Sequence, residues 1–337
     1  SFKQNIMKRN KITILVAFFA VLLHSGCEEI TVNDPDFSVQ LADGQVIQQL
    51  GDTLVCKKTD NLKFLIEGNP DMLVFYSGQS GNDYRYKDRT EIDGNPSMSF
   101  RTTLTFGLQF TGLKVYLSST FPGMTRDEAI DRVNLANMDY WTDITAQCNL
   151  PTTKNAPNNT TSTPKIDLSA YKGKPLYIAF RVAHPNGNES TWRLENLSIV
   201  NKFNGVDIEV GTFRNIGFTA FDMFAATDPY LNNGNSTDKV NRRWNLTTAA
   251  SNYITGGASN GSTTIDNDDW AVSTKIDLTK TFPDIGTAIK GFDNAPLEEY
   301  EYSYSVPGIY HIAFVGVNSL YNARSETVKE MIVKIID

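Results

Sequence analysis

Residues 300–337 read YEYSYSVPGIYHIAFVGVNSLYNARSETVKEMIVKIID, and this closing stretch decides the fold. The opening YEYSY alternates tyrosines with polar residues, as a strand with one buried face does. Pro307-Gly308 predicts a tight turn, and the apolar segments 310–317 and 328–336 predict two further strands. So small a set of strands is marginally stable in water. Its edges must therefore pair with strands from elsewhere in the chain.

Strands that could supply this pairing lie near the other end of the sequence. Residues 37–67 read FSVQLADGQVIQQLGDTLVCKKTDNLKFLIE, with clear alternation from Leu62 to Ile66 and a turn at Gly51-Asp52. They predict two or three antiparallel strands. We expect the two sets to pair, because pairing would cover the exposed edges of both.

One family combines these features. The pattern Gly51-Asp52 … Tyr304-x-x-Pro307-Gly308-x-Tyr310-x-x-x-Phe314-x-x-x-Asn318 resembles the first and last strands of a polycystic-kidney-disease-type immunoglobulin-like domain. The resemblance implies an Ig-like β-sandwich formed by residues 37–94 plus 289–337 and split by a large insertion. Two unrelated β-hairpin extensions are the alternative.

The insertion, residues 95–288, has strand motifs of its own. They run from LKVYL (113–117) and YWTDIT (140–145), across an Asn/Thr/Pro loop, to IDLSAY (166–171), KPLYIAFRV (174–182), STWRLENLSI (190–199) and DWAVSTKIDL (269–278). This order resembles the galactose-binding-like jelly rolls of cleaved-adhesin and carbohydrate-binding modules. The whole chain is therefore expected to be all-β, with few helices.

The first residues predict export and anchoring. Residues 1–6 precede an expected initiator, Met7, and residues 1–26 have a basic start and an apolar run of about twelve residues, too short to span a bilayer. Ser25-Gly26-Cys27 resembles a bacterial lipobox of the looser Bacteroidota type, although His24 takes the usual leucine position. Acylated Cys27 would then begin the mature chain, with 27–36 as linker, and Glu28-Glu29 resembles a surface-export signal. A soluble exported protein and an uncleaved anchor are the alternatives.

Charge limits the partners of the mature chain. Removing residues 1–26 leaves 27 basic and 38 acidic residues, a net charge near −11. This balance argues against nucleic acid and anionic lipid headgroups as ligands. The pattern Glu67-Gly68-Asn69-Pro70-Asp71 … Tyr84-x-Tyr86-x-x-Arg89 resembles surface lipoproteins encoded beside starch-utilisation-type importers in gut Bacteroides. That resemblance implies an extracellular face of the outer membrane, with a TonB-dependent transporter and its partner lipoproteins as neighbours.

The expected function is non-catalytic binding of a polysaccharide, an oligosaccharide or another nutrient. Sugar sites combine aromatic rings with a few placed polar groups. Tyr230, Arg242, Trp244 and Tyr253 follow or flank an Asn/Gly-rich loop and form the predicted ligand platform. Trp141, Trp192 and Trp270 lie in strand motifs and are expected to pack in the core. The alternative function is a structural, adhesin or assembly subunit without a small ligand.

The acidic run DNDDW suggests one cofactor. Asp266, Asp268 and Asp269 offer oxygen ligands for a structural calcium ion, although adjacent acids on a loop also commonly face solvent. Catalytic patterns are weak, so no enzyme is expected. GQSG (78–81) lacks the G-x-S-x-G spacing, and its glycines are better explained by a turn. The isolated His184 and His311 exclude a histidine-rich metal site.

Three further sites remain open in the sequence. Cys56 and Cys148 could form a disulfide in an exported protein, but buried free thiols explain them as well. Asp52-Thr53-Leu54 resembles a short O-glycosylation pattern centred on Thr53. Tyr84, Tyr86 and Arg89 suit a hinge at the domain junction better than a ligand site.

Overall fold

The computed structural model describes residues 31–59, 61–184, 190–225, 228–230, 244–257 and 267–337. Nearly all regular structure in this part of the chain is β-strand, so the predicted all-β sandwich is confirmed. The chain divides into two compact units. We call residues up to 87 with 284–337 the split unit, and residues 88–283 the inserted unit. The sequence placed these junctions a few residues later, at 94/95 and 288/289.

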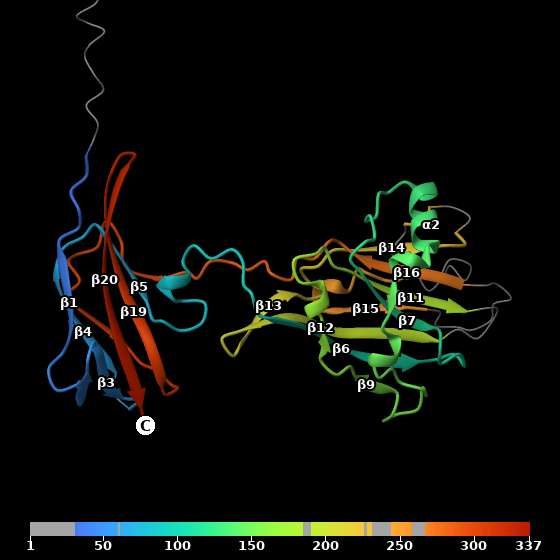
Figure 1. The fold of residues 1–337 in the computed structure, drawn as a ribbon, viewed down its shortest axis with the longest axis horizontal. Coiled ribbons are helices and arrows are strands. Elements are labelled where there is room, and N and C mark those ends of the chain that lie inside the picture. The colour runs from blue at the N-terminus through green and yellow to red at the C-terminus, as the bar shows by residue number, and fades with distance from the viewer. Residues whose placement is uncertain (1–30, 60, 185–189, 226–227, 231–243, 258–266) are drawn as a thin grey trace, which may run out of the picture. The chain divides into compact units, whose positions relative to one another are not determined.

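The split unit contains strands from both ends of the sequence (Figure 1). A three-stranded sheet has the order β1-β4-β18, and a six-stranded sheet has the order β17-β5-β19-β20-β3-β2. The elements are β1 (Phe37–Leu41), β2 (Gln48–Leu50), β3 (Thr53–Lys57), β4 (Leu62–Gly68), β5 (Met72–Tyr76), η1 (Tyr84–Tyr86), β17 (Thr287–Lys290), β18 (Glu299–Tyr302), β19 (Gly308–Leu320) and β20 (Ala323–Ile336).

Pairing between distant strands holds the split unit together. β18 pairs with β4 and β19 with β5, both antiparallel, while β20 runs parallel to β3. An aromatic core lies between the two sheets, where the ring centroids of Phe64, Phe75 and Phe314 are 5.0 to 5.8 Å apart. The pairing expected from the exposed edges of the two strand sets is therefore present.

The inserted unit has its own pair of sheets. One has the order β10-β6-β12-β13, with β15 pairing β12 and β9 pairing β6; the other has the order β14-β16-β11-β7-β8. Its elements are β6 (Asn95–Thr105), β7 (Leu113–Ser118), α2 (Glu128–Ala136), η2 (Met138–Tyr140), β8 (Thr142–Asp143), η3 (Thr145–Gln147), β9 (Thr160–Ser162), β10 (Ile166–Asp167), η4 (Ser169–Tyr171), β11 (Tyr177–His184), β12 (Thr191–Phe203), β13 (Val206–Gly211), β14 (Phe218–Asp222), η5 (Ala249–Ser251), β15 (Tyr253–Gly256) and β16 (Asn267–Ser273).

The two sheets of the inserted unit differ in what covers their outer faces. A large apolar core fills the space between them. The outer face of the β14-β16-β11-β7-β8 sheet carries aromatic side chains that pack with the segment around α2, on the side away from β6 and β12 (Figure 1). The outer face of the sheet that contains β6 and β12 instead alternates half-buried and exposed polar residues. That polar face is the open face of the sandwich.

The chain enters and leaves the inserted unit at neighbouring positions. Ile92 N–H donates to Thr279 O at 2.8 Å, and Thr281 N–H donates to Thr90 O at 2.9 Å. The entering and leaving segments are therefore paired with each other. In the split unit, Asp284 N–H donates to Tyr86 O at 3.1 Å, which closes the gap left by the insertion.

Cys56 and Cys148 are both buried, form no disulfide and lie in different units. Cys56 lies on β3 and Cys148 follows η3. Burial raises the pKa of the Cys148 thiol to about 12. Each is therefore a packing residue and not half of a disulfide.

Candidate functional site

Two neighbouring rows of polar side chains cross the open face of the inserted unit. The first row is Thr255 on β15, Arg193 on β12, Thr103 on β6 and Thr160 on β9. The second is Tyr253, Glu195, Arg101 and Ser162 on the same four strands. We call these eight residues the two-row face. Side chains opposite one another on adjacent strands lie close enough to interact, so the register assembles one continuous polar surface.

Glu195 is the centre of the two-row face. Its side chain is largely buried, and Arg101 Nε and Nη2 donate to Glu195 Oε2 at 3.0 and 2.8 Å. Arg193 Nη2 lies 2.9 Å from the other carboxylate oxygen, Oε1. Thr103 Oγ1 donates to Glu195 Oε2 at 3.4 Å. One nearly buried carboxylate therefore binds two guanidinium groups, that of Arg101 on the adjacent strand β6 and that of Arg193 on its own strand β12.

Both arginines keep part of their surface in solvent. The side chains of Arg101 and Arg193 are 48% and 44% exposed. The guanidinium carbon of Arg193 lies 3.9 Å from the centroid of the Tyr253 ring, so it is stacked on the ring while it pairs with Glu195. Each guanidinium has five N–H donors in a fixed fork, more than Glu195 uses. The face thus presents positioned donors to the solvent.

Local sequence explains why these side chains point outward. In TWRLE (191–195) the buried Trp192 and Leu194 alternate with Arg193 between them. Successive strand residues face opposite sides of the sheet, so Arg193 lies opposite the core. Glu195 follows on the same face before a register shift between Glu195 and Ser198. The alternation that places Trp192 and Leu194 in the core therefore also places Arg193 and Glu195 on the outer face.

Trp244 lies in the core and not on a ligand platform, which corrects the role expected from its polar neighbours. Its side chain has no exposed surface, and its Nε1–H donates to Asp269 O at 3.1 Å. The ring lies over Gly256, where a Cβ atom would come within 2.7 Å of it. Glycine at 256 provides the room for the indole, and an indole without solvent contact cannot stack on a sugar.

The other predicted platform residues are not brought onto one surface with Trp244. Tyr253 belongs to the two-row face, where its ring supports Arg193. Tyr230 is half-buried elsewhere: its hydroxyl donates to Asp131 Oδ2 at 2.7 Å and its ring packs edge-on against Phe221. Burial, followed by the hydrogen bond to Asp131, raises the pKa of Tyr230. Arg242 lies outside the described residues.

The acidic run does not form a metal site among the residues that the structure describes. Both carboxylate oxygens of Asp268 accept hydrogen bonds from Arg181, at 2.7 Å each, and these bonds raise the pKa of that arginine. Asp269 is the next residue on β16 and points to the other side of the sheet, where Asn267 Nδ2 donates to its Oδ2 at 2.8 Å. Asp266 lies outside the described residues. Asp268 therefore acts as an ion-pair partner.

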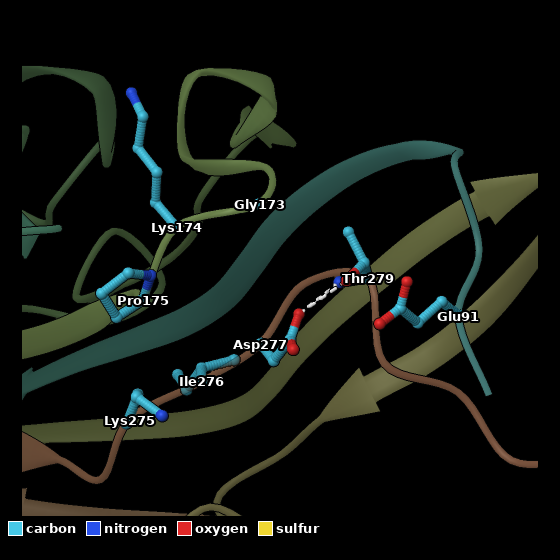
Figure 2. A pocket seen from close by; sticks show the side chains of 8 residues that line it. All are labelled: Glu91, Gly173, Lys174, Pro175, Lys275, Ile276, Asp277 and Thr279. Carbon is cyan, nitrogen blue, oxygen red and sulfur yellow. Dashed lines mark hydrogen bonds between the residues drawn. The ribbon is translucent and has the colours of Figure 1, made fainter.

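A cleft of about 400 Å³ opens elsewhere on the inserted unit. It is lined by Glu91, Gly173, Lys174, Pro175, Lys275, Ile276, Asp277 and Thr279 (Figure 2). The Thr279 N–H and Oγ1–H both donate to Asp277 Oδ1, at 3.0 and 2.8 Å, and lower the pKa of this carboxyl. None of the eight lining residues is aromatic. The cleft therefore offers less for sugar recognition than the two-row face.

The segment from Gly78 to Arg89 contains a turn followed by η1, and along it the chain passes from the split unit to the inserted unit. Gly78 and Gly81 have φ values of 75° and 82°, which confirms the expectation that these glycines serve a turn. Gly78 N–H donates to Asn82 O at 2.9 Å. Tyr84 and Tyr86 belong to η1 within the split unit, and the guanidinium of Arg89 lies over Phe203 in the inserted unit.

Sequence reasoning missed Arg101, Arg193 and Glu195. Arg193 and Glu195 lie in a strand motif whose most prominent residue is Trp192, so their own role on the outer face is not apparent from the sequence. Arg101 lies 94 residues before Glu195. Alternation of charged residues with buried apolar ones in TWRLE was the available signal. The pairing of β6 with β12, which completes the group, has no local signal.

Among the described residues, no helix has the length and hydropathy needed to cross a bilayer. The fold and the two-row face define an all-β protein with a polar surface on its inserted unit. The chain belongs to a family described as a domain of unknown function, DUF5017, whose model matches residues 26–218. Searches of curated proteins and of solved structures found no match to this chain.

Proposed function

We propose that this protein is a non-catalytic glycan-binding lipoprotein on the extracellular face of the outer membrane. The two-row face carries the proposal, because it is an open sheet surface with hydroxyl, guanidinium, carboxylate and phenol groups at neighbouring positions. Sugars present rows of hydroxyls that donate and accept hydrogen bonds, and placed polar groups of this kind orient them. The negative net charge of the chain supports a glycan over nucleic acid.

The anchor and the partners are further parts of the proposal. Acylation at Cys27, supported by the lipobox-like Ser25-Gly26-Cys27, would tether the protein beside a TonB-dependent transporter and its partner lipoproteins. A weak binding face on a tethered protein raises the local ligand concentration through avidity. The split unit is proposed to be an Ig-like domain and the inserted unit a galactose-binding-like jelly roll, in line with their two-sheet construction.

Native affinity electrophoresis of the full chain in gels containing polysaccharides tests the binding function. We expect at least one polysaccharide to retard the protein and Tyr253→Ala to weaken the retardation, because Arg193 loses its aromatic support. Tyr321→Ala is the matched control, since Tyr321 is 90% exposed in the split unit. Absence of retardation by every glycan, with co-purification of the transporter, would favour the assembly role instead.

The anchor is tested separately. Cys27→Ala is expected to abolish acylation and release the protein from the membrane fraction, as followed by metabolic labelling with a fatty acid. Unchanged processing and membrane association in that variant would contradict the lipoprotein proposal.

A further inference from the structure

The arrangement of charges on the two-row face indicates which glycans it takes. Two arginines share one glutamate, Glu195, so the group retains one net positive charge in a chain whose formal net charge is −7. The planar fork of a guanidinium binds two oxygens of one anion with two parallel hydrogen bonds, whether the anion is a planar carboxylate or a tetrahedral group such as a sulfate ester.

Both guanidiniums are oriented before a ligand arrives. Arg193 is fixed between the Tyr253 ring, 3.9 Å away, and Glu195 Oε1, 2.9 Å away. Arg101 is fixed by two hydrogen bonds to Glu195 Oε2. The Glu195 side chain that holds them is 11% exposed, whereas each arginine side chain is more than 40% exposed. Fixing the donors in advance reduces the entropy lost when a ligand binds.

Neutral groups beside the arginines complete a sugar-sized surface. Thr103 Oγ1 and Thr160 Oγ1 lie 3.0 Å apart, and both belong to the row that contains Arg193. These hydroxyls suit the uncharged hydroxyls of a sugar ring, while the arginines suit an acidic substituent on it.

We infer that the two-row face binds acidic glycans, with Arg101 and Arg193 pairing a carboxylate or sulfate group of the sugar. The inference rests on the proposed glycan-binding function and adds the class of ligand. The negative field of the whole chain opposes polyanions at long range, so recognition depends on the bidentate contact and not on general attraction.

The test compares matched polysaccharides in native affinity gels with the full chain. Polygalacturonate supplies carboxylates, dextran sulfate supplies sulfates, and pullulan and unmodified dextran are the neutral counterparts. We expect one or both acidic polymers to retard the protein more than the neutral ones, and the two acidic arms show which anion is preferred. DNA, a phosphodiester polyanion without exposed sugar rows, is expected not to retard it.

Arginine variants locate the contact. Arg193→Gln and Arg101→Gln are each expected to weaken retardation by the acidic polymer about tenfold or more, as the loss of a charged bidentate contact does. Arg193→Lys keeps the charge and is expected to lose affinity as well, because an ammonium cannot replace the planar fork. Arg324→Gln is the control, since Arg324 pairs with Glu326 at the same two-residue spacing on β20 and is 62% exposed.

Each outcome separates the two proposals. If neutral and acidic polymers bind equally and the arginine variants keep wild-type affinity, acidic specificity is overturned while glycan binding stands. If Arg324→Gln weakens binding as much as Arg193→Gln, or DNA binds equally, the effect is general charge and the inference is again overturned. If no polymer binds, the proposed function itself fails. Tryptophan emission matching the wild type confirms that the inserted unit, which carries the two-row face and all four tryptophans, is folded in each variant.

Discussion

At the scale of single residues, Trp244 shows how a polar neighbourhood in sequence can surround a core side chain. Its neighbours Asn245 and the arginines at 242–243 suggested a surface loop. The structure places its indole over Gly256, with its N–H bonded to a backbone carbonyl. The room for the ring is provided by Gly256, twelve residues later on β15, and the local composition around Trp244 cannot indicate this contact.

Replacing Trp244 is expected to affect stability far more than binding. Trp244→Ala should lower the free energy of unfolding of the inserted unit by about 3–5 kcal/mol, the usual cost of truncating a buried large aromatic residue. Urea unfolding followed by the emission of the three remaining tryptophans measures the change. Tyr321→Ala is the exposed control and should have little effect. A Trp244→Ala protein as stable as the wild type would contradict the core placement.

His184 makes the inserted unit sensitive to acid. It is 5% exposed, its Nε2 has no hydrogen-bond partner in the described part of the chain, and burial lowers its pKa. The unfolded chain binds a proton near the ordinary histidine pKa of about 6.5, while the folded chain resists it. The contribution of His184 to the free energy of unfolding is therefore complete above the ordinary histidine pKa and is lost progressively as the pH falls below it.

A neutral substitution tests the effect of His184. We expect the urea midpoint of the wild type to fall more between pH 7.5 and 5.5 than that of His184→Gln, because carboxylate effects are common to both proteins. Equal decreases in the two proteins would remove His184 as a source of the pH dependence.

At the scale of elements, β20 links the two ends of the chain into one sheet. It pairs with β19 along its length and runs parallel to β3, with Val333 and Ile335 in the core. The apolar segment 328–336 predicted this strand, but from Val328, whereas it begins at Ala323. Residues 323–327 lack apolar alternation, and the hairpin with β19 extends the strand through them.

Placing a charge in β20 is expected to unfold the split unit. Val333→Asp would bury a carboxylate among apolar side chains, at a cost of several kcal/mol. Hydrogen exchange read by mass spectrometry should show faster exchange in β3, β5 and β19 and unchanged protection in the inserted unit. The matched control is Lys334→Asp on the exposed side of the same strand. Protection of the split unit in both variants would contradict this account.

At the scale of the whole molecule, the sequence predicted the all-β class and the pairing of its two ends. Those features depend on alternation and on strand edges, which are visible locally. Of the two-row face, the sequence predicted only Tyr253 as a ligand-binding residue. Arg101 and Glu195 are 94 residues apart and meet only through the pairing of β6 with β12, which the sequence does not reveal. Charged and hydroxyl side chains on an outer strand face give only a weak sequence pattern, because almost any polar residue can occupy a solvent-exposed position.

The inserted unit is expected to fold on its own. Its entering and leaving segments are paired at residues 90–92 and 279–281, and its core lies within residues 88–283. A protein comprising these residues should show cooperative unfolding. All four tryptophans lie within it, at 141, 192, 244 and 270, so its emission spectrum should match that of the full chain. A red-shifted spectrum and non-cooperative unfolding would show that the split unit is needed.

The neighbouring entry and exit points also bear on how such proteins diversify. Because the two ends of the insertion lie side by side, the split unit is interrupted at a single loop, between Tyr86 and Asp284. Recombination could exchange the coding segment for residues 88–283 with that of another module of similar ends. The inserted module would then change while the host sandwich was inherited unaltered.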